Sequence, residues 1–322
     1  MVDSALRQAF ITASRSAQAE KIVRSSPLTK PLVQRFVAGD TFMAARAAAD
    51  RLATGELLVT YDHLGEAITA EAAVREMVHL YKGYFAAAPR GSHFSLKLSQ
   101  LGLTIRESLA QEALETLCTE AAQYDHRLRV DMEESATIDA TLRLVEEARG
   151  RGGDPGIVVQ AMLRRAPELL QWAIDHDVRV RLVKGAYQEP EFVAYQGREP
   201  VRRAYLALLG PLLAKSRAPA VATHDDTLLA AAAQIAAQFG ARPYEVQFLY
   251  GVREDYAREL VHGGIPVRIY TPFGTAWYPY FMRRLAERPQ NVGFFLRQVI
   301  DMAATAATNA AANTRSGNGR GK

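Results

Sequence analysis

The stretch DVRVRLVKGAY, residues 177–187, combines a strand pattern with a cluster of polar side chains at its end. Its first half alternates apolar and basic residues with a period of two and is rich in valine, which indicates a β-strand. Arg181, Lys184 and Tyr187 then gather beside Gly185, where that strand should end. Two cations and a phenol in this position suggest a binding site at the carboxyl end of a sheet.

The same pattern of a β-like run, a turn and a helix-like stretch repeats from about residue 55 onward. The β-like runs are ELLVTYD (56–62), HFSLKLS (93–99), RLRVDME (127–133), GIVVQAM (156–162), VRVRLVK (178–184), PAVATHD (219–225), YEVQFLY (244–250) and PVRIYTP (266–272). Eight such units without a GxGxxG motif predict an α/β fold, a distorted (β/α)8 barrel of the TIM type with N-terminal helices.

Three segments are predicted along the chain. Residues 1–54 form an N-terminal helical segment, which includes the Ala-rich stretch TFMAARAAADRLATG, and residues 55–302 form the barrel. Residues 303–322 consist largely of Ala, Asn and Gly, with almost nothing large to bury, and predict a disordered tail.

Composition narrows the class of protein. The 322 residues are 48% hydrophobic, which is enough for a full core, and the one cysteine, Cys118, cannot form an internal disulfide. No apolar run reaches the roughly 18 residues of a membrane span, so we expect a cytoplasmic protein. The net charge is +4, but Arg315, Arg320 and Lys322 lie in the tail without an acidic residue. The body is therefore nearly neutral, which argues against nucleic-acid binding.

Polar residues end every predicted strand. In a (β/α)8 barrel the chemistry lies at the carboxyl ends of the strands, because the βα loops converge there. These ends carry Asp62, Lys97, Asp131, Gln160, Arg181 with Lys184, His224 with Asp225, Gln247 and Tyr270. Either they form an active site, or they pair with one another as polar residues of the barrel rim.

The last predicted helix, WYPYFMRRLAERPQN, carries Tyr280, Arg283, Arg284 and Glu287 at positions i, i+3, i+4 and i+7. Residues with this spacing share one face of a helix. The face is either solvated with an internal ion pair, or a clamp for a carboxylate, since each guanidinium offers a planar fork of donors.

The sequence also bears on two other kinds of chemistry, metal catalysis and Schiff-base formation. Seven histidines are scattered without an HxH or HExxH pair, so no catalytic metal is expected. Lys97 and Lys184 could each form a Schiff base, which makes a lyase or aldolase the main alternative.

These motifs in this order resemble the proline dehydrogenase family. The similarity covers roughly residues 30 to 300 and runs through RFVAGDT, YDHLGE, SLKLSQLG, RVDMEES, VVQAML, RLVKGAY, ATHDD, YEVQFLYG, RIYTPFG and YFMRRLAE. The family oxidises L-proline to Δ1-pyrroline-5-carboxylate with FAD. The length and the RFVAG segment resemble the single-function bacterial enzymes.

The resemblance implies an FAD site. Arg181 matches the arginine beside the flavin N5, where it stabilises the electron-rich reduced ring. The other cofactor contacts implied are Gln160, Val183, Lys184, Gly185, Ala186, Thr223, His224, Asp225, Gln247 and Glu287. Asp225 departs from the asparagine of the bifunctional branch, and Tyr250 from a histidine.

The resemblance also implies a proline site. Arg283 and Arg284 match the arginines that bind the proline carboxylate, with Lys97 as a second cation. Asp131 is expected to pair with Tyr270 or Lys97 and hold them in place. Tyr187, Leu249, Tyr270 and Tyr280 are expected to wall in the proline ring.

The resemblance implies partners as well. The electron acceptor is expected to be a quinone, reached at the membrane surface, so the cytoplasmic protein would attach peripherally to the inner face of the membrane. Pyrroline-5-carboxylate dehydrogenase is the implied downstream partner.

Overall fold

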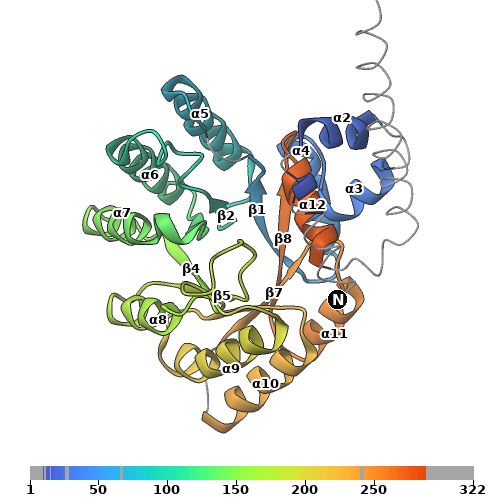
Figure 1. The fold of residues 1–322 in the computed structure, drawn as a ribbon, viewed down its shortest axis with the longest axis vertical. Helices are drawn as coiled ribbons and strands as arrows, with labels where there is room; N and C mark the ends of the chain where they lie inside the picture. Colours follow the sequence, from blue (N-terminus) through green and yellow to red (C-terminus); the bar gives the residue numbers. More distant parts are fainter. Residues whose placement is uncertain are drawn as a thin grey trace, which may run out of the picture. The chain divides into compact units, whose positions relative to one another are not determined.

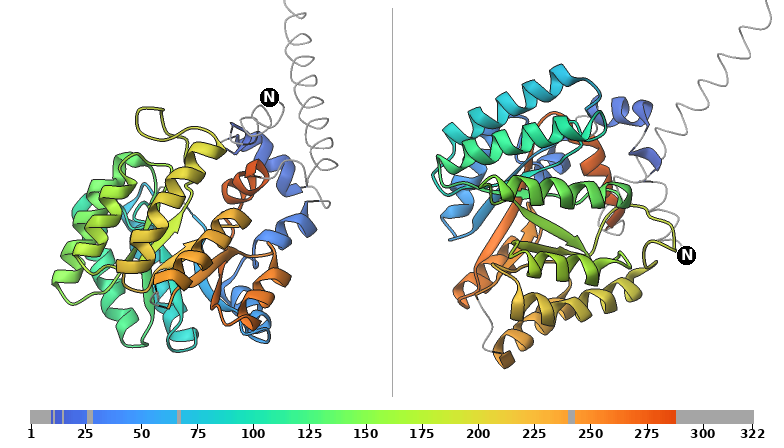
Figure 2. Two further views of the ribbon diagram at one scale, coloured as in Figure 1. Left: turned by 90° about the horizontal axis from the view of Figure 1, so that it is seen from below. Right: turned by 90° about the vertical axis from the view of Figure 1, so that its left-hand side faces the viewer.

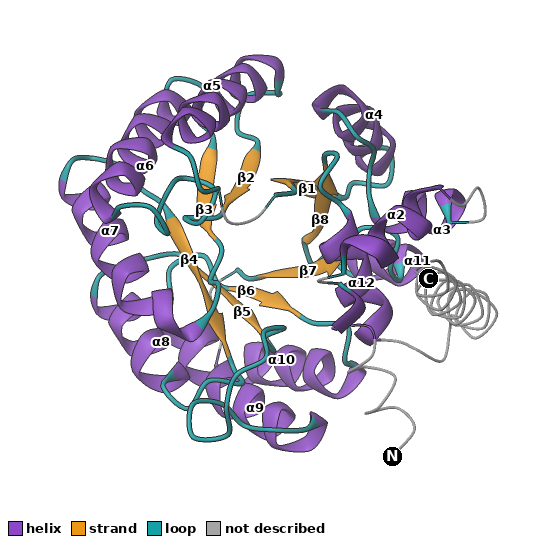
Figure 3. Ribbon diagram, turned by 45° about the horizontal axis from the view of Figure 1, so that its top comes forward, coloured by secondary structure: helices purple, strands orange, loops and turns teal. Residues whose placement is uncertain are grey.

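A closed parallel barrel forms the main part of the molecule (Figures 1 and 3). The computed structural model describes residues 10, 12–14, 16–25, 29–65, 68–239 and 243–287. Its strands are β1 (Leu58–His63), β2 (His93–Leu96), β3 (Arg127–Val130), β4 (Gly156–Gln160), β5 (Val180–Val183), β6 (Ala220–Ala222), β7 (Glu245–Leu249) and β8 (Val267–Phe273). Each strand pairs with the next along the chain, and β8 pairs with β1.

Helices surround the strands on the outside, as the views in Figures 2 and 3 show. They are α4 (Phe42–Ala53), α5 (Glu71–Ala87), α6 (Glu107–Ala122), α7 (Ile138–Gly150), α8 (Ala166–Asp175), α9 (Arg198–Lys215), α10 (Asp226–Phe239) and α11 (Glu254–His262), with a 3-10 turn η1 (Ser135–Thr137). In α6 the buried residues include Leu114, Leu117 and Ala121, the i, i+3, i+7 spacing of a helix with one apolar face. This burial is why the segment forms a helix against the barrel.

The seam between β1 and β8 is covered by aromatic packing. The ring of Phe42 from α4 lies 5.1 Å from Tyr61 of β1 and 5.6 Å from Phe273 of β8, both edge-on. Such pairs add about 0.5 to 1.5 kcal/mol each beyond their burial. The helix that directly precedes the barrel, α4, therefore packs on both of the strands that close it.

The apolar and basic residues that alternate in DVRVRLVKGAY lie on the two faces of β5, and both faces are buried. Val180 and Leu182 are 0% exposed and belong to the apolar core. Arg179 and Arg181, which alternate with them along the chain, are also buried, at 7% and 4% exposed. The arginines therefore do not point to solvent, and each must find acceptors inside the protein.

The chain divides into two compact units, which are residues 38–275 with the barrel, and residues 1–37 with 276–322. The described helices of the second unit are α2 (Ala17–Ser25), α3 (Lys30–Phe36) and α12 (Tyr278–Glu287). Within it, the Tyr278 hydroxyl donates to the Ala13 carbonyl at 2.7 Å, and the rings of Phe36 and Phe281 lie 6.4 Å apart.

The expected fold class and all eight strands are confirmed. The predicted boundaries at residues 54 and 302 stay predictions, and the predicted tail, residues 303–322, lies outside the described residues. In the described part of the chain, no helix combines the length and the apolar character needed to cross a bilayer.

Asp154, in the loop before β4, collects the charges of several arginines. Its carboxylate lies 2.6 Å from Arg149, 3.4 Å from Arg179 and 3.6 Å from Arg127, and it accepts a further hydrogen bond from Arg217. Removing this charge leaves several cations close together without their shared partner.

We expect Asp154→Asn to lower the free energy of unfolding by about 1 to 3 kcal/mol, measured by urea denaturation at pH 7. The matched control is Asp139→Asn, because Asp139 is 63% exposed and pairs with Arg165 alone among the ion pairs found. That control should cost under about 1 kcal/mol. Equal losses in both variants would contradict a special role for Asp154.

Candidate active site

Arg181 of β5 bridges the inside of the barrel. Its Nη1 donates to Asp131 Oδ1 at 2.8 Å and to Ser95 Oγ at 3.2 Å, and its Nε donates to Gln247 Oε1 at 2.6 Å. β5 pairs only with β4 and β6 in the sheet, whereas Ser95 lies on β2, Asp131 follows β3 and Gln247 lies on β7. These contacts therefore cross the barrel interior.

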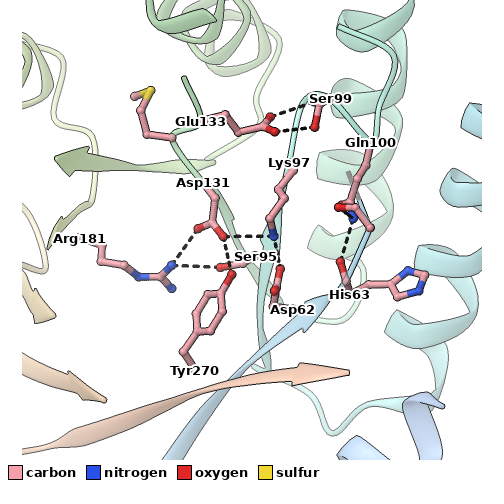
Figure 4. A network of polar contacts seen from close by, with 12 residues as sticks. Asp62, His63, Ser95, Lys97, Ser99, Gln100, Asp131, Glu133, Arg181 and Tyr270 are labelled. Carbon is pink, nitrogen blue, oxygen red and sulfur yellow. Dashed lines mark hydrogen bonds and ion pairs between the residues drawn. The ribbon is translucent and has the colours of Figure 1, made fainter. Parts of the chain in front are cut away.

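Asp131 is the centre of this cluster (Figure 4). Its Oδ1 accepts from Arg181, and its Oδ2 accepts from the Tyr270 hydroxyl at 2.6 Å, with Lys97 Nζ at 3.7 Å. The Arg181 guanidinium also lies 5.1 Å from the centre of the Tyr270 ring. One carboxylate thus contacts three side chains from β5, β8 and the end of β2. Tyr270 and Lys97 were expected as alternative partners of Asp131, and Asp131 contacts both.

Tyr270 is held as a hydrogen-bond donor. Burial, together with the charge of Asp131, raises the pKa of the Tyr270 phenol well above its ordinary value. The phenol therefore remains protonated at neutral pH and donates to the carboxylate.

Lys97 is held as a cation. Its Nζ lies 2.5 Å from Asp62 Oδ1, and the Lys97 side chain is 8% exposed. Burial alone would lower the pKa of Lys97, but Asp62 and Asp131 raise it above its ordinary value. An amine that attacks a carbonyl must be unprotonated, so this pair weighs against the Schiff-base alternative for Lys97.

The loops at the carboxyl ends of β1, β2 and β3 are tied to each other. Glu133 accepts from the Ser99 amide at 3.0 Å and from its hydroxyl at 2.5 Å. The Gln100 amide group donates to the carbonyls of His63 at 2.8 Å and Gly65 at 2.7 Å. These bonds fix the backbone segment that follows Lys97.

The ends of β4 and β5 form a close backbone approach. Gln160 is 2% exposed, and its Nε2 donates to the Glu133 carbonyl at 2.8 Å. Gly185 has a φ of +102°, and a Cβ there would lie 2.6 Å from the Met162 sulfur. Only glycine fits this position without displacing a neighbour.

Two buried polar side-chain atoms near the carboxyl ends of β4 and β5 indicate what kind of ligand this region could bind. Among the described residues, neither Arg181 Nη2 nor Gln160 Oε1 has a hydrogen-bond partner. One is a donor and the other an acceptor, and buried groups of this kind are normally satisfied. A flavin ring carries both acceptors and an N–H donor, so these residues fit the cofactor that the sequence resemblance implies.

Lys184 is paired at the mouth of the barrel. Its Nζ lies 2.6 Å from Asp225 Oδ2, which also accepts from Arg202 Nε at 3.0 Å. Oδ1 of Asp225 accepts from the Thr227 amide at 3.2 Å, and the Asp225 carbonyl accepts from Leu229, so this residue caps α10. Burial would raise the pKa of Asp225, but Lys184 and Arg202 lower it to about 2.

His224 and Thr223 join the ends of β6 and β7. The Leu249 amide donates to His224 Nε2 at 3.2 Å, and the His224 ring stacks on Phe248 with centroids 4.8 Å apart. Thr223 Oγ1 accepts from the Asp225 amide at 3.2 Å. Both residues lie where the sequence predicted them, after β6.

The other predicted residues fall into two groups. Val183 ends β5, Ala186 and Tyr187 follow it, and Leu249 ends β7, so all four lie at the carboxyl ends of strands. Tyr280, Arg283, Arg284 and Glu287 belong to α12 in the other unit, and their part in the site stays a prediction from the sequence. The Glu287 side chain lies outside what is described.

Two residues near the strand ends were not predicted from the sequence. They are Ser95, which contacts Arg181, and Arg202, which contacts Asp225. Ser95 precedes Lys97 by two positions, so the period of a strand could have placed both on one face. Arg202 lies on α9, and no local signal links it to Asp225.

Within the described ranges, no group of three or more His, Cys, Asp or Glu side chains could hold a metal ion.

A closed parallel barrel with its polar cluster at the carboxyl ends of the strands defines a (β/α)8-barrel enzyme. The model of the family described as proline dehydrogenase matches residues 45–297. Proline dehydrogenase 1 of Bacillus subtilis (strain 168) is 35% identical over 92% of this chain and 99% of its own length. The proline dehydrogenase of Deinococcus radiodurans is 32% identical over 93% and 99%. The chain belongs to the proline dehydrogenase family.

Solved structures agree on the fold. Proline utilization A (PutA) from Bdellovibrio bacteriovorus superposes with a TM-score of 0.76 at 22% identity, covering 85% of this chain and 34% of that one. PutA from Bradyrhizobium japonicum gives 0.68 at 24% identity, over 82% and 31%.

The ion pairs of Asp225 should make the stability of the protein depend on pH in the acidic range. Its folded pKa of about 2 lies below the roughly 3.9 of an unfolded aspartate, so its stabilising effect is full above about pH 4 and is lost as the pH falls toward 2. Asp225→Asn keeps a capping oxygen but loses the charge. We expect its melting temperature to lie below that of the original protein at pH 6, with the difference shrinking toward pH 3.

Asp226→Asn is the matched control, because Asp226 is 77% exposed and pairs with Arg253. Its melting temperature should differ little from that of the original protein at either pH. A gap for Asp225→Asn that stayed constant from pH 6 to pH 3 would contradict the assigned pairing.

Proposed function

We propose that this protein binds FAD and oxidises L-proline to Δ1-pyrroline-5-carboxylate, the first step of proline catabolism. The observation that carries the proposal is the cluster of Arg181, Asp131, Tyr270 and Lys97 at the carboxyl ends of the barrel strands. Membership of the proline dehydrogenase family supports the choice of substrate.

FAD, when bound, supplies the acceptor for a hydride from the proline carbon next to the ring nitrogen. Its site is assigned to the residues at the ends of β4 to β7, with Arg181 presenting its free Nη2. The residues proposed to hold the cofactor are Gln160, Arg181, Val183, Lys184, Gly185, Ala186, Thr223, His224, Asp225, Gln247 and Glu287. Asp225 contributes by positioning Lys184 and Arg202.

Proline is bound through its carboxylate and its ring. Arg283 and Arg284, with Lys97 as a further cation, are proposed to bind the carboxylate, and this assignment rests on the sequence resemblance. Tyr187, Leu249, Tyr270 and Tyr280 are proposed to enclose the ring. Asp131 holds both Tyr270, which contacts the proline ring, and the Arg181 guanidinium. The position of the substrate ring is therefore fixed relative to this cation.

The nitrogen of proline supplies the electron pair for the new double bond in the substrate. The ring carbon loses a hydride, and the nitrogen lone pair forms the carbon–nitrogen double bond of a protonated iminium. Release of the N–H proton to water then gives the neutral imine. Proline must therefore be bound with its amine unprotonated. A buried, charged Arg181 stabilises the negative charge that the transfer delivers.

We further propose a quinone as the electron acceptor, reached at the membrane surface from the cytoplasmic side. Pyrroline-5-carboxylate dehydrogenase is the proposed downstream partner. The relative named Bifunctional protein PutA of Escherichia coli (strain K12) is 33% identical over 82% of this chain and 24% of its own length.

The direct test is spectroscopic. Purified protein should be yellow, its flavin absorption should bleach when L-proline is added without oxygen, and acid precipitation should release the flavin, since it is held noncovalently. Arg181→Met should bind FAD more weakly or bleach more slowly at saturating proline. A colourless protein that borohydride links to a carbonyl substrate through a lysine would instead indicate a lyase.

Tyr270 is proposed to select proline over hydroxyproline. Its phenol is tethered to Asp131, so it cannot move aside for a 4-hydroxyl group on the substrate ring. We expect Tyr270→Ser to shift the ratio of kcat/KM values toward trans-4-hydroxy-L-proline by roughly tenfold, since a misfit of methylene size is worth about 1 to 3 kcal/mol. The measurement is steady-state kinetics with both substrates.

Tyr270→Phe is the control, because it keeps the ring and loses only the bond to Asp131. Its kcat/KM for proline should fall while the substrate ratio stays close to that of the original protein. If Tyr270→Ser slowed both substrates equally, Tyr270 would support the site without selecting the substrate.

A further inference from the structure

A chain of hydrogen bonds leads from Arg181 down the barrel interior. Arg181 Nε donates to Gln247 Oε1 at 2.6 Å, and Gln247 Nε2 donates in turn to Glu245 Oε1. Glu245 and Gln247 are two residues apart on β7, so both side chains lie on the same face of the strand. Arg268 of β8 closes the chain, with its Nε 3.0 Å from both Glu245 oxygens.

The polarity of this chain allows one orientation of the Gln247 amide. Arginine is only a donor and an ionised carboxylate is only an acceptor. The oxygen of Gln247 must therefore face Arg181, and its NH2 group must face Glu245. Reversing the amide would set an NH2 group against the Arg181 N–H and a carbonyl oxygen against a carboxylate.

Glu245 is ionised despite its burial. Burial would raise the pKa of Glu245, but the charge and hydrogen bonds of Arg268 lower it below its ordinary value. Arg268 is fixed in turn by donating to the Val59 carbonyl at 2.9 Å. Glu245 is therefore an acceptor that is held in place from below.

The orientation of Arg181 depends on both ends of its guanidinium. Asp131 and Ser95 hold Nη1, and Gln247 holds Nε, so the remaining Nη2 is aimed by these three contacts. Without the Gln247 acceptor, the guanidinium is held on one side only and can rotate.

We propose that Glu245 is a positioning residue, which acts through Gln247 to aim the Arg181 guanidinium at the cofactor. The inference rests on the proposed function, because it takes Arg181 to stabilise the reduced flavin. The rival view is that Glu245 does no more than neutralise Arg268.

Four variants separate the two views. Glu245→Met with Arg268→Met removes the buried pair without leaving a lone charge. Gln247→Met removes the intermediate residue, and a triple variant combines all three changes. Glu245→Gln is the conservative variant, since it loses the charge but keeps an acceptor oxygen for Gln247.

The readouts are the midpoint potential of the bound flavin, measured with redox dyes and no proline, and the rate constant of flavin reduction at saturating proline. In the pair-deleted variant the potential should fall and the rate constant should drop about tenfold, the scale of one lost charged hydrogen bond. The triple variant should match Gln247→Met alone, and Glu245→Gln should stay close to the original protein.

Three results would overturn the role of Glu245. They are an unchanged potential in the pair-deleted variant, effects of the pair and of Gln247 that multiply in the triple variant, and a Glu245→Gln variant as impaired as Gln247→Met. If the original protein bound flavin but proline did not bleach it, the proposed function would fail. The dye-measured potentials would still test whether Glu245 acts through Gln247.

Discussion

The interaction on which the barrel site depends is the bond between Arg181 and Asp131 across the inside of the barrel. A guanidinium and a carboxylate buried in this way are expensive to desolvate, and they persist because each has further partners. Ser95 and Gln247 accept further hydrogen bonds from Arg181, while the Tyr270 hydroxyl donates to Asp131. The positions of the βα loops then follow, because the strands that carry these side chains cannot shift without breaking the cluster.

This arrangement explains how a rigid site is obtained at the open end of a barrel. Loops are normally the most mobile part of such folds. Here Lys97 is anchored by Asp62, and the segment that follows it is bonded to Glu133 and to the carbonyl of His63. The polar groups therefore keep fixed distances from one another, which a hydride transfer between two bound molecules requires.

Much of the fold could be predicted from the sequence, for a physical reason. Strands buried on the outer face by helices need an apolar residue at every second position, and Val180 and Leu182 show this pattern openly. The polar residues at the strand ends, among them Asp131 and Tyr270, were visible because parallel strands bring their carboxyl ends together. The pairing of Asp131 with Tyr270 came only from resemblance, since 139 residues separate them.

Other contacts could not be predicted, because they depend on where strands meet around the barrel. The register of β7 and β8 places Arg268 beside Gln247, and the Arg268 side chain reaches Glu245 two residues earlier on β7, which no local pattern reveals. Asp225 was expected to contact the cofactor, and its bonds to Lys184 and Arg202 depend on the packing of α9 beside it.

The charged barrel interior also bears on how such a chain folds and divides. Arg181 takes its partners from positions 50, 66 and 86 residues away, and Arg268 bonds a carbonyl 209 residues earlier in the chain. A cut between β4 and β5 would separate the buried guanidinium of Arg181 from the carboxylate of Asp131. These long-range contacts stabilise the barrel only after its last strands have joined. This favours slow, cooperative folding and a barrel that does not tolerate being split into independent halves.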